Sequence, residues 1–421
     1  MSMAEEEKEK CLGDGSSSSP PSTTIANHTL TKVLGFALLG GFCAYLVFSA
    51  SGGSFFPSDP SDDGDVDGGC NFFAGSWISN PSGPAYTNAS CKYIDPPNDC
   101  MTNGRPDREY LYWRWKPQSC DLPRANAEKF LNAMRNKAWG LVGDSIFRNQ
   151  HNSWLCLLSQ VEEATDIYHD EDYQSRTWYF PSYNFTLALL WAPFLLKAEV
   201  SRDASRNYDI KLHLDALERT WTNQYSNFDY IIISGGQWFL KTTMYLENNT
   251  IVGCHNCPEK DVKDLGFDYA YRKALQLSFN FIIESDHKPL VLFRTWLADH
   301  FEYGEWYSGG VCNRTEPYKA GEFNGDATDN MMWRLEVEEF KKAAAIGSKN
   351  RTRLKLFDTY HLSLLRPDGH PGPYRKLHPD LSKKPQNDCL HWCLPGPVDT
   401  WNDLATVIAL NEEDSRSSSM K

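Results

Sequence analysis

The chain has 421 residues, of which 41 % are hydrophobic and 13 % aromatic, which is enough apolar material for one large or two ordinary domains and too much for a mostly disordered protein. Its 42 Lys and Arg against 55 Asp and Glu give a formal net charge of −13. Because a nucleic-acid-binding protein needs a basic surface, DNA and RNA are excluded as expected partners.

An uncharged apolar run near the start predicts a membrane span. Residues 33–50 carry no charged side chain. At about 1.5 Å per helical residue, such a run is near the minimum length that crosses ~30 Å of hydrocarbon. A cleaved signal peptide is the weaker interpretation, because residues 1–32 precede the run and no convincing small-residue cleavage site follows it. We therefore predict an uncleaved transmembrane signal anchor at residues 30–50.

The positive charges around this span predict its orientation. Lys8, Lys10 and Lys32 precede the uncharged run at residues 33–50, whereas the next basic residue after it is Lys92. Positive charges near a span stay on the cytosolic side. We expect a cytosolic tail at residues 1–29 and, after the span, a flexible stem rich in Gly, Ser and Asp at residues 51–69.

Cysteines and glycosylation sequons also indicate a luminal location. Of 12 Cys, Cys11 and Cys43 fall in the expected tail and span, which leaves an even number beyond the membrane, where an oxidising compartment favours disulfides. This layout is typical of a single-pass type II protein of the Golgi membrane. Five candidate glycosylation sites follow the span, at Asn88, Asn184, Asn248, Asn313 and Asn350.

The luminal part divides into two regions. Residues 70–137 are rich in Cys and Trp with little periodicity and read as a disulfide-tied segment. From residue 138, short apolar runs alternate with helical patterns, which predicts a mostly parallel sheet covered by helices on both faces at residues 138–411, followed by a disordered polar tail at residues 412–421. The expected strands are residues 138–142, 230–233, 290–293 and 354–357, and the expected helices begin at residue 145 and cover residues 269–284 and 331–345.

Two motifs carry nucleophilic chemistry. Gly143, Asp144 and Ser145 follow the first of these strands and open a helix, so the Ser145 hydroxyl would lie at the helix N-terminus, where the partial positive charge suits a developing oxyanion. The alternative is that Asp144 is a helix cap and Ser145 an ordinary serine. Near the C-terminus, Asp388 and His391 are three residues apart, so the carboxylate can orient the imidazole. This chain order of Ser, Asp and His is one of those found in serine esterases and acyltransferases.

Two alternatives concern the same C-terminal region. Cys389, His391 and Cys393 have the residue types of a zinc site when combined with Cys254 and Cys257. An oxidising lumen favours disulfides over thiolates, so no metal is expected. The Pro- and Gly-rich stretch at residues 366–371 contains a second possible base, His370.

These motifs, together with Arg105-Pro106-Asp107 and the W-R-W-K-P stretch at residues 113–117, resemble the plant trichome birefringence-like proteins over residues 70–410. These are Golgi polysaccharide O-acetyltransferases with a domain like that of GDSL/SGNH hydrolases. The resemblance implies a three-layer α/β/α fold of the SGNH-hydrolase type with an appended disulfide-rich segment. It assigns Ser145 as the nucleophile that carries the acetyl group, His391 as general base and acid, and Asp388 as the orienting carboxylate.

The resemblance also implies the substrates. No bound cofactor is expected, but an acetyl donor is required, either acetyl-CoA or another activated acetyl carrier. The acceptor would be a plant cell-wall hemicellulose, with xyloglucan as the first choice and mannan or xylan as alternatives. A hypothesis from another class is a non-catalytic protein that binds and bridges wall glycans.

The oxyanion hole is the part of the resemblance that does not carry over. Ordinary SGNH hydrolases supply an Asn from a G-x-N-D block, whereas the strand at residues 230–233 is followed by Ser234-Gly235-Gly236-Gln237-Trp238. The candidate donors are therefore the N–H groups of Ser145 and of Gly235 or Gly236 and the Gln237 amide. Arg148, one turn beyond Ser145, could bind the donor or the oxyanion, or could be an ordinary surface arginine.

The resemblance further implies disulfide pairs. We expect Cys70 with Cys120, Cys91 with Cys156, Cys312 with Cys389, and Cys393 with either Cys254 or Cys257. The last two bridges would flank His391, so reduction should abolish activity.

Overall fold

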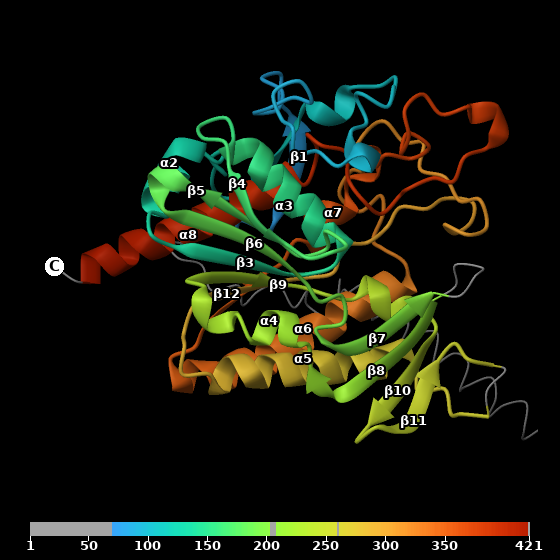
Figure 1. Cartoon of the computed structure of the whole chain (residues 1–421). Coiled ribbons are helices and arrows are strands. Elements are labelled where there is room, and N and C mark those ends of the chain that lie inside the picture. The colour runs from blue at the N-terminus through green and yellow to red at the C-terminus, as the bar shows by residue number, and fades with distance from the viewer. Residues whose placement is uncertain (1–69, 203–207, 259–260, 420–421) are drawn as a thin grey trace, which may run out of the picture. The chain divides into compact units, whose positions relative to one another are not determined.

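The computed structural model describes residues 70–202, 208–258 and 261–419 (Figure 1). The expected cytosolic tail, membrane span and stem, residues 1–69, lie outside them. The helices within the described ranges include none that is both long and apolar enough to cross a membrane. The chain divides into two units, Met1–Asp62 and Asp63–Lys421, and all described residues belong to the second.

A seven-stranded sheet forms the centre of the described part, in the order β13-β12-β9-β3-β6-β5-β4. The first five strands in this order are parallel to one another, and β5 and β4 add an antiparallel edge. The four strands predicted from the sequence are all present in the parallel part. The bounds are β3 Ala138–Gly143, β4 Thr165–His169, β5 Arg176–Phe180, β6 Phe185–Trp191, β9 Tyr230–Ile233, β12 Leu290–Arg294 and β13 Arg353–Phe357.

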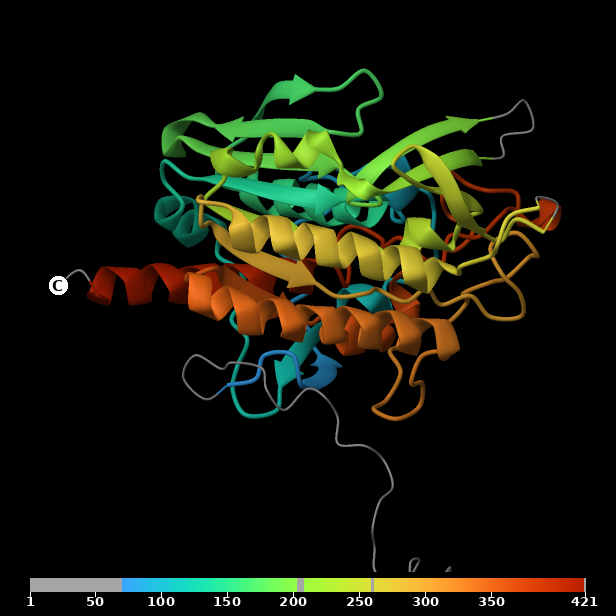
Figure 2. The same cartoon turned by 90° about the horizontal axis from the view of Figure 1, so that it is seen from below.

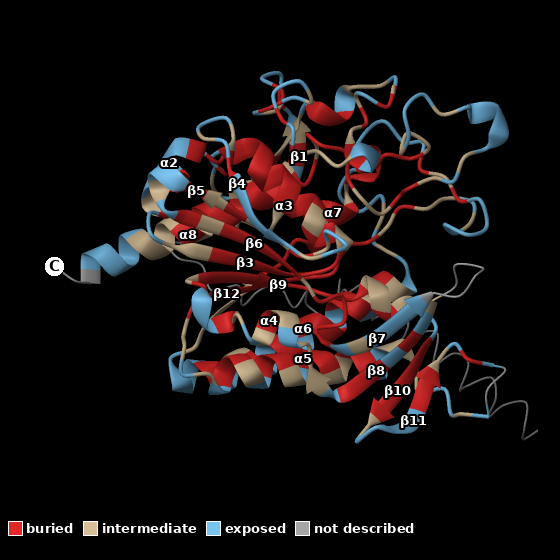
Figure 3. Cartoon of the chain, viewed as in Figure 1, coloured by how far each residue is buried: buried red, intermediate tan, exposed pale blue. Residues whose placement is uncertain are grey.

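Alternate residues of the parallel strands face two separate cores. In β6, Leu187 and Leu189 belong to one buried cluster, and Ala188 and Leu190 belong to the other. The first cluster includes side chains of α2 (Ala127–Ala133), α3 (Ser145–Leu158) and α8 (Asp399–Ser419), and the second includes those of α4 (Arg219–Thr222), α5 (Phe267–Glu284) and α6 (Ala327–Gly347). Figures 1 and 2 show these two helical layers on opposite faces of the sheet, and Figure 3 shows its central strands as buried. The predicted α/β/α layering is therefore present.

Two smaller sheets were not anticipated from the sequence. One has the order β11-β10-β8-β7 and the other pairs β1 with β2 in the Cys-rich segment. The second sheet contains the W-R-W-K-P stretch, whose Trp115 is buried. Their bounds are β1 Gly75–Ser79, β2 Trp113–Pro117, β7 Leu196–Arg202, β8 Tyr208–Leu217, β10 Thr243–Glu247 and β11 Thr250–His255. The remaining helices are α7 Tyr360–Leu364 and the 3₁₀ turns η2 Pro96–Asn98, η3 Glu109–Leu111, η4 Pro181–Tyr183, η5 Tyr225–Asn227, η6 Gln237–Leu240, η7 Ser348–Asn350, η8 Pro367–Gly369 and η9 Leu381–Lys383.

The C-terminal segment differs from the expected disordered tail at residues 412–421. Helix α8 continues to Ser419. Its Glu412 pairs with Arg353 at 2.8 Å and with Lys355 at 3.2 Å. Glu413 accepts a hydrogen bond from Tyr230. These contacts attach the polar end of α8 to strands β13 and β9, which local sequence polarity does not reveal.

Five disulfides join the described cysteines. Three are the pairs implied by the family resemblance, Cys70–Cys120, Cys91–Cys156 and Cys312–Cys389. The fourth expectation, Cys393 with Cys254 or Cys257, was wrong. Cys254 and Cys257 pair with each other close to the end of β11, and Cys393 pairs with Cys100 of the Cys-rich segment. Cys393 pairs with Cys100 because the Cys-rich segment packs against the C-terminal region, which brings together two cysteines that are 293 positions apart in the chain.

Candidate active site

Ser145 lies at the carboxyl end of β3 and is the first residue of α3. Asp144 precedes it as the helix cap, and its carboxylate accepts a hydrogen bond from the Ile146 N–H at 2.9 Å. Asp144 is therefore the helix cap, which agrees with the first half of the alternative interpretation. Because the cap fixes where α3 begins, it places Ser145 at the N-terminus of the helix. The partial positive charge there favours negative charge near the Ser145 oxygen.

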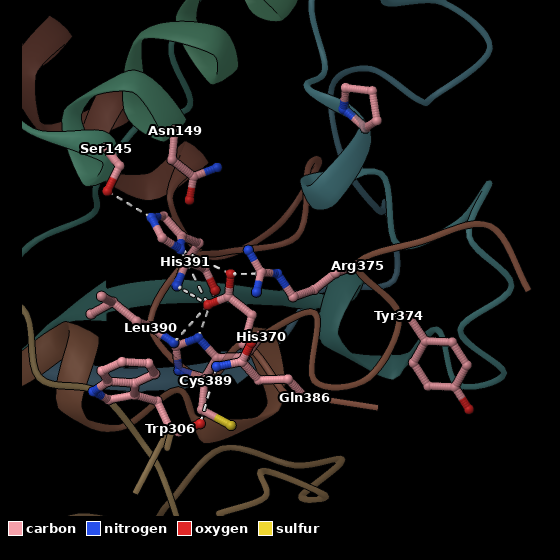
Figure 4. A network of polar contacts seen from close by, with 12 residues as sticks. Ser145, Asn149, Trp306, His370, Tyr374, Arg375, Gln386, Cys389, Leu390 and His391 are labelled. Atoms are coloured by element: carbon pink, nitrogen blue, oxygen red, sulfur yellow. Dashed lines mark hydrogen bonds and ion pairs between the residues drawn. The ribbon is translucent and has the colours of Figure 1, made fainter. Parts of the chain in front are cut away.

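The structure brings together the three side chains singled out from the sequence (Figure 4). His391 Nε2 lies 2.8 Å from Ser145 Oγ, and His391 Nδ1 lies 2.9 Å from Asp388 Oδ2 and 3.1 Å from Oδ1. The His391 side chain is 24 % exposed and that of Asp388 only 6 %. A hydroxyl, an imidazole and a buried carboxylate in this order can generate a nucleophilic oxygen, because the imidazole can take the hydroxyl proton while the carboxylate stabilises the resulting cation.

Three hydrogen-bond donors and one cation, the Arg375 guanidinium, converge on the Asp388 carboxylate. Besides His391 Nδ1, its Oδ1 accepts the backbone N–H groups of Leu390 at 3.2 Å and His391 at 3.0 Å, and its Oδ2 lies 3.3 Å from Arg375 Nε. Burial alone would raise the pKa of Asp388, but the charges of His391 and Arg375 and these hydrogen bonds outweigh it and hold the pKa below its usual range. Asp388 is therefore ionised near neutral pH.

The same contacts act on His391 in the opposite direction. Burial lowers the pKa of His391, but the charge and hydrogen bond of Asp388 outweigh burial, so the pKa is raised above 6.5. Arg375 opposes this rise. His391 is accordingly a stronger base than a free histidine, and Arg375 limits how strongly it holds a proton. No local pattern in the sequence singled out Arg375.

Asn149 holds the segment after His391 against helix α3. Its Oδ1 accepts the N–H of Trp392 at 2.7 Å, and its Nδ2 donates to the carbonyl of the same residue at 3.1 Å. Sequence reasoning missed this residue, although its position four residues beyond Ser145, on the same face of the helix, was a usable signal.

The Cys-rich segment supports the other side of the same region. Arg105 donates to the carbonyls of His370 at 2.7 Å and Asp368 at 2.6 Å while pairing with Asp107. The Cys100–Cys393 disulfide adds a covalent link two residues beyond His391. This segment therefore contributes to positioning the site, beyond wrapping the core.

His370, the possible second base, supports the backbone of the site. Its Nδ1 donates to the His391 carbonyl at 2.7 Å, its Nε2 lies 2.7 Å from His300 Nδ1, and its ring stacks on Trp392 with 4.2 Å between centroids. Burial lowers the pKa of His370 well below 6.5 and that of His300 to about 4. With both nitrogens of His370 engaged, its ring holds the backbone of His391.

The candidate oxyanion donors lie at the same edge of the sheet as Ser145. Gly235 and Gly236 follow β9, the parallel neighbour of β3, so both strands end at that edge. Gly236 has a φ of 125°, and a Cβ there would lie 2.7 Å from the ring of Trp296. The Gln237 amide donates to the Leu297 carbonyl at 2.9 Å and is engaged with the protein itself.

Arg148 lies against an aromatic ring. The centre of its guanidinium is 5.2 Å from the ring centroid of Trp191, the last residue of β6. This contact gives the side chain a structural partner. Its suggested role toward the donor or the oxyanion stays a prediction.

The alternative zinc site is not formed. All four of its cysteines are in disulfides, and Cys254 and Cys257 pair with each other rather than with Cys389 or Cys393. In the described ranges, no cluster of three or more His, Cys, Asp or Glu is arranged to hold a metal ion. The disulfides remove the thiolates that the zinc hypothesis required.

The asparagines of the five sequons differ in exposure. Asn88 is half-buried, and the other four asparagines are exposed. Asn184 has a side chain engaged with Tyr179 and Asn136. Glycosylation at these positions stays a prediction.

Comparison with known proteins gives two adjoining family matches. Residues 122–407 match the PC-esterase model, described as a GDSL/SGNH-like acyl-esterase family found in Pmr5 and Cas1p, and residues 68–121 match the PMR5 N-terminal domain. Trichome birefringence-like 26 of Arabidopsis thaliana is 49 % identical over 404 residues, covering 94 % of this chain and 90 % of that protein. Trichome birefringence-like 25 of the same plant is 53 % identical over 356 residues, covering 82 % and 78 %. Xyloglucan O-acetyltransferase 1 of Arabidopsis thaliana is 40 % identical over 339 residues, covering 80 % and 79 %.

Proposed function

The chain belongs to the PC-esterase family of GDSL/SGNH-like acyl-esterases, and from that premise we propose that it transfers acetyl groups to hydroxyls of a plant cell-wall polysaccharide. The observation that carries the proposal is the hydrogen-bonded series from Ser145 through His391 to the ionised Asp388. The name of the xyloglucan O-acetyltransferase relative supports a polysaccharide acceptor.

The first half of the reaction loads the enzyme. His391 Nε2 takes the proton of Ser145 Oγ as that oxygen attacks the carbonyl carbon of the acetyl donor. The bond to the donor's leaving group then breaks, and the leaving group receives the proton from His391. Ser145 is left as an acetyl ester and His391 is neutral again, ready for the second half.

The second half releases the acetyl group to the acceptor. A sugar hydroxyl gives its proton to His391 Nε2 and attacks the acetyl carbon, and the ester bond to Ser145 Oγ breaks as that oxygen recovers the proton. Asp388 stabilises the His391 cation in both halves and remains ionised. The N–H of Ser145 and that of Gly235 or Gly236 are the donors we assign to the oxyanion, because they meet at one edge of the sheet.

We propose xyloglucan as the acceptor, with mannan and xylan as alternatives, and acetyl-CoA or another activated acetyl carrier as the donor. The proposed location is the Golgi lumen, with the chain anchored in the membrane through residues 30–50. The sequons and cysteines beyond that run support a luminal location.

The test is acetyl transfer by the full chain in detergent. Labelled acetyl donor is supplied with deacetylated xyloglucan, glucomannan or xylan, and label on the polymer is measured. Ser145→Ala is compared with Ser159→Ala, a change at the other end of the same helix, where the hydroxyl donates only to the Cys156 carbonyl. We expect Ser145→Ala to abolish transfer and Ser159→Ala to retain it.

Three outcomes decide the proposal. Recovery of the Ser145 peptide with one acetyl group attached, formed from donor in the absence of acceptor, would support the two-step course. Equal transfer by wild type and Ser145→Ala would refute it. Polymer binding without any transfer would favour the non-catalytic glycan-binding hypothesis.

A further inference from the structure

Three aromatic side chains are exposed together on one loop. Tyr303, Trp306 and Tyr307 are 92 %, 57 % and 72 % exposed, and the rings of Trp306 and Tyr307 meet edge to face with 5.4 Å between centroids. These residues belong to residues 303–310, which we name the aromatic loop. Large aromatic rings left in water gain nothing for folding, whereas they supply much contact area to a ligand at a low cost in side-chain entropy.

The base of the aromatic loop is joined to the segment that carries Asp388 and His391. The Cys312–Cys389 disulfide closes it covalently, and the backbone N–H of His300 donates to the Cys389 carbonyl at 2.9 Å. The tip is joined as well, because Gln386 Nε2 donates to the Trp306 carbonyl at 3.1 Å. Figure 4 labels Trp306 and Gln386 in the same view as Ser145 and His391. The three rings are therefore attached on both sides to the segment that bears the proposed base.

The loop is also held in shape internally. Glu302 and Val311 exchange backbone hydrogen bonds of 2.7 and 2.9 Å across its neck, and Glu305 accepts the N–H groups of Ser308 and Gly310. A held loop presents its rings without a large ordering cost on binding.

From these contacts we propose that the aromatic loop is a binding platform for the acceptor polysaccharide, on which sugar rings stack while a neighbouring residue of the same chain reaches Ser145. The inference rests on the proposed function and specifies how its site holds a polymer. The flat C–H faces of β-linked sugar rings pack against aromatic rings through dispersion.

The charge of the loop selects among possible occupants. Glu305, next to Trp306, is exposed and is the one charged residue among residues 303–310. A phosphate-bearing acetyl donor or an acidic polysaccharide would be repelled here, whereas a neutral hemicellulose would not. The platform is therefore assigned to the neutral acceptor.

The test compares Trp306→Ala with Tyr168→Ala in the full chain. Tyr168 is an aromatic residue that is 53 % exposed and serves as the matched control. It lies on β4, the edge strand of the central sheet opposite the edge strand β13. Three quantities are measured: the dissociation constant for deacetylated xyloglucan, the same constant for polygalacturonate, and hydrolysis of an aryl acetate, which needs Ser145 but no polymer. We expect Trp306→Ala to weaken xyloglucan binding roughly tenfold, the equivalent of one lost aromatic contact.

The expected pattern is specific. Trp306→Phe should restore most of the binding, Tyr168→Ala should bind as wild type, aryl acetate hydrolysis should be unchanged in all three, and polygalacturonate should bind poorly throughout. Unchanged xyloglucan binding in Trp306→Ala would overturn the proposal. A wild-type chain that is a dimer in solution, with a Trp306→Ala variant that is a monomer and still binds polymer, would also overturn it, since the loop would then pair two copies of the chain.

The proposed function can fail separately. If Ser145→Ala leaves acetyl transfer unchanged while Trp306→Ala loses polymer binding, the platform stands and the catalytic assignment falls. If transfer depends on Ser145 but neither binding nor the KM for polymer responds to Trp306→Ala, the catalytic assignment stands and the platform falls.

Discussion

Replacing Asp388 by Asn tests the His391 assignment most directly, because the structure shows what the new amide would face. Asp388 Oδ1 accepts two backbone N–H groups, from Leu390 and His391. These would retain the amide oxygen of an asparagine in the same place. The amide NH₂ must then replace Oδ2, which lies 2.9 Å from His391 Nδ1 and 3.3 Å from Arg375 Nε.

An NH₂ group in that position reverses the hydrogen bond to His391. Because the amide donates, Nδ1 must accept, and the neutral imidazole then carries its proton on Nε2, 2.8 Å from Ser145 Oγ. A protonated Nε2 cannot take the Ser145 proton. The imidazolium that forms during transfer would also lose its carboxylate partner.

We expect Asp388→Asn to lower kcat by about 10³- to 10⁴-fold, a barrier increase of ~4 to 5.5 kcal/mol, since the same exchange in a serine protease costs ~10⁴-fold. The assay is acetyl transfer to deacetylated xyloglucan with thermal unfolding of the same preparation. At neutral pH the substitution also removes stability that the lowered pKa of Asp388 contributes, a contribution present above the ordinary range of an aspartate and lost as the pH falls through the folded-state pKa. A kcat within threefold of wild type, in a folded protein, would remove Asp388 from the mechanism and put the role of His391 in question.

Because the pKa of His391 is raised above 6.5, the acid limb of kcat/KM should lie above that value, and Arg375→Gln, which removes an opposing positive charge, should move this limb to still higher pH in a pH–rate series. An acid limb that moves to lower pH in Arg375→Gln would contradict this account. His370→Ala should lower kcat by only about 5- to 30-fold, the effect of ~1 to 2 kcal/mol from a lost hydrogen bond to the His391 carbonyl, whereas a loss of 10³-fold or more would revive His370 as the base. Exchanging both Cys312 and Cys389 for Ser removes their bridge and should lower the free energy of unfolding by about 2 to 5 kcal/mol in chemical denaturation. The KM for polymer should rise by a larger factor than the one by which the rate of aryl acetate hydrolysis changes. An unchanged KM in the folded variant would show that the bridge does not position the aromatic loop.

Those parts of the protein that depend on local order along the chain could be predicted from the sequence. Buried parallel strands are continuous apolar runs, so residues 230–233 and 290–293 were recognised as strands. Ser145 was recognised because a strand, a turn and a helix follow one another directly in the chain. Asp388 and His391 were recognised because they are three residues apart, so no long-range contact was needed to pair them.

Contacts between distant segments were decided only by the tertiary structure. Arg375 reaches Asp388, and Asn149 reaches Trp392, through folding that no local pattern encodes. Cys393 pairs with Cys100, and the sequence could not choose this partner because every cysteine is chemically alike and only packing selects the pair. The end of α8 was taken for a disordered tail because its residues are polar, and the partners that order it lie on strands far away in the chain. Spacing in the sequence therefore identified the reacting groups, and the packed chain determined which groups hold them in position.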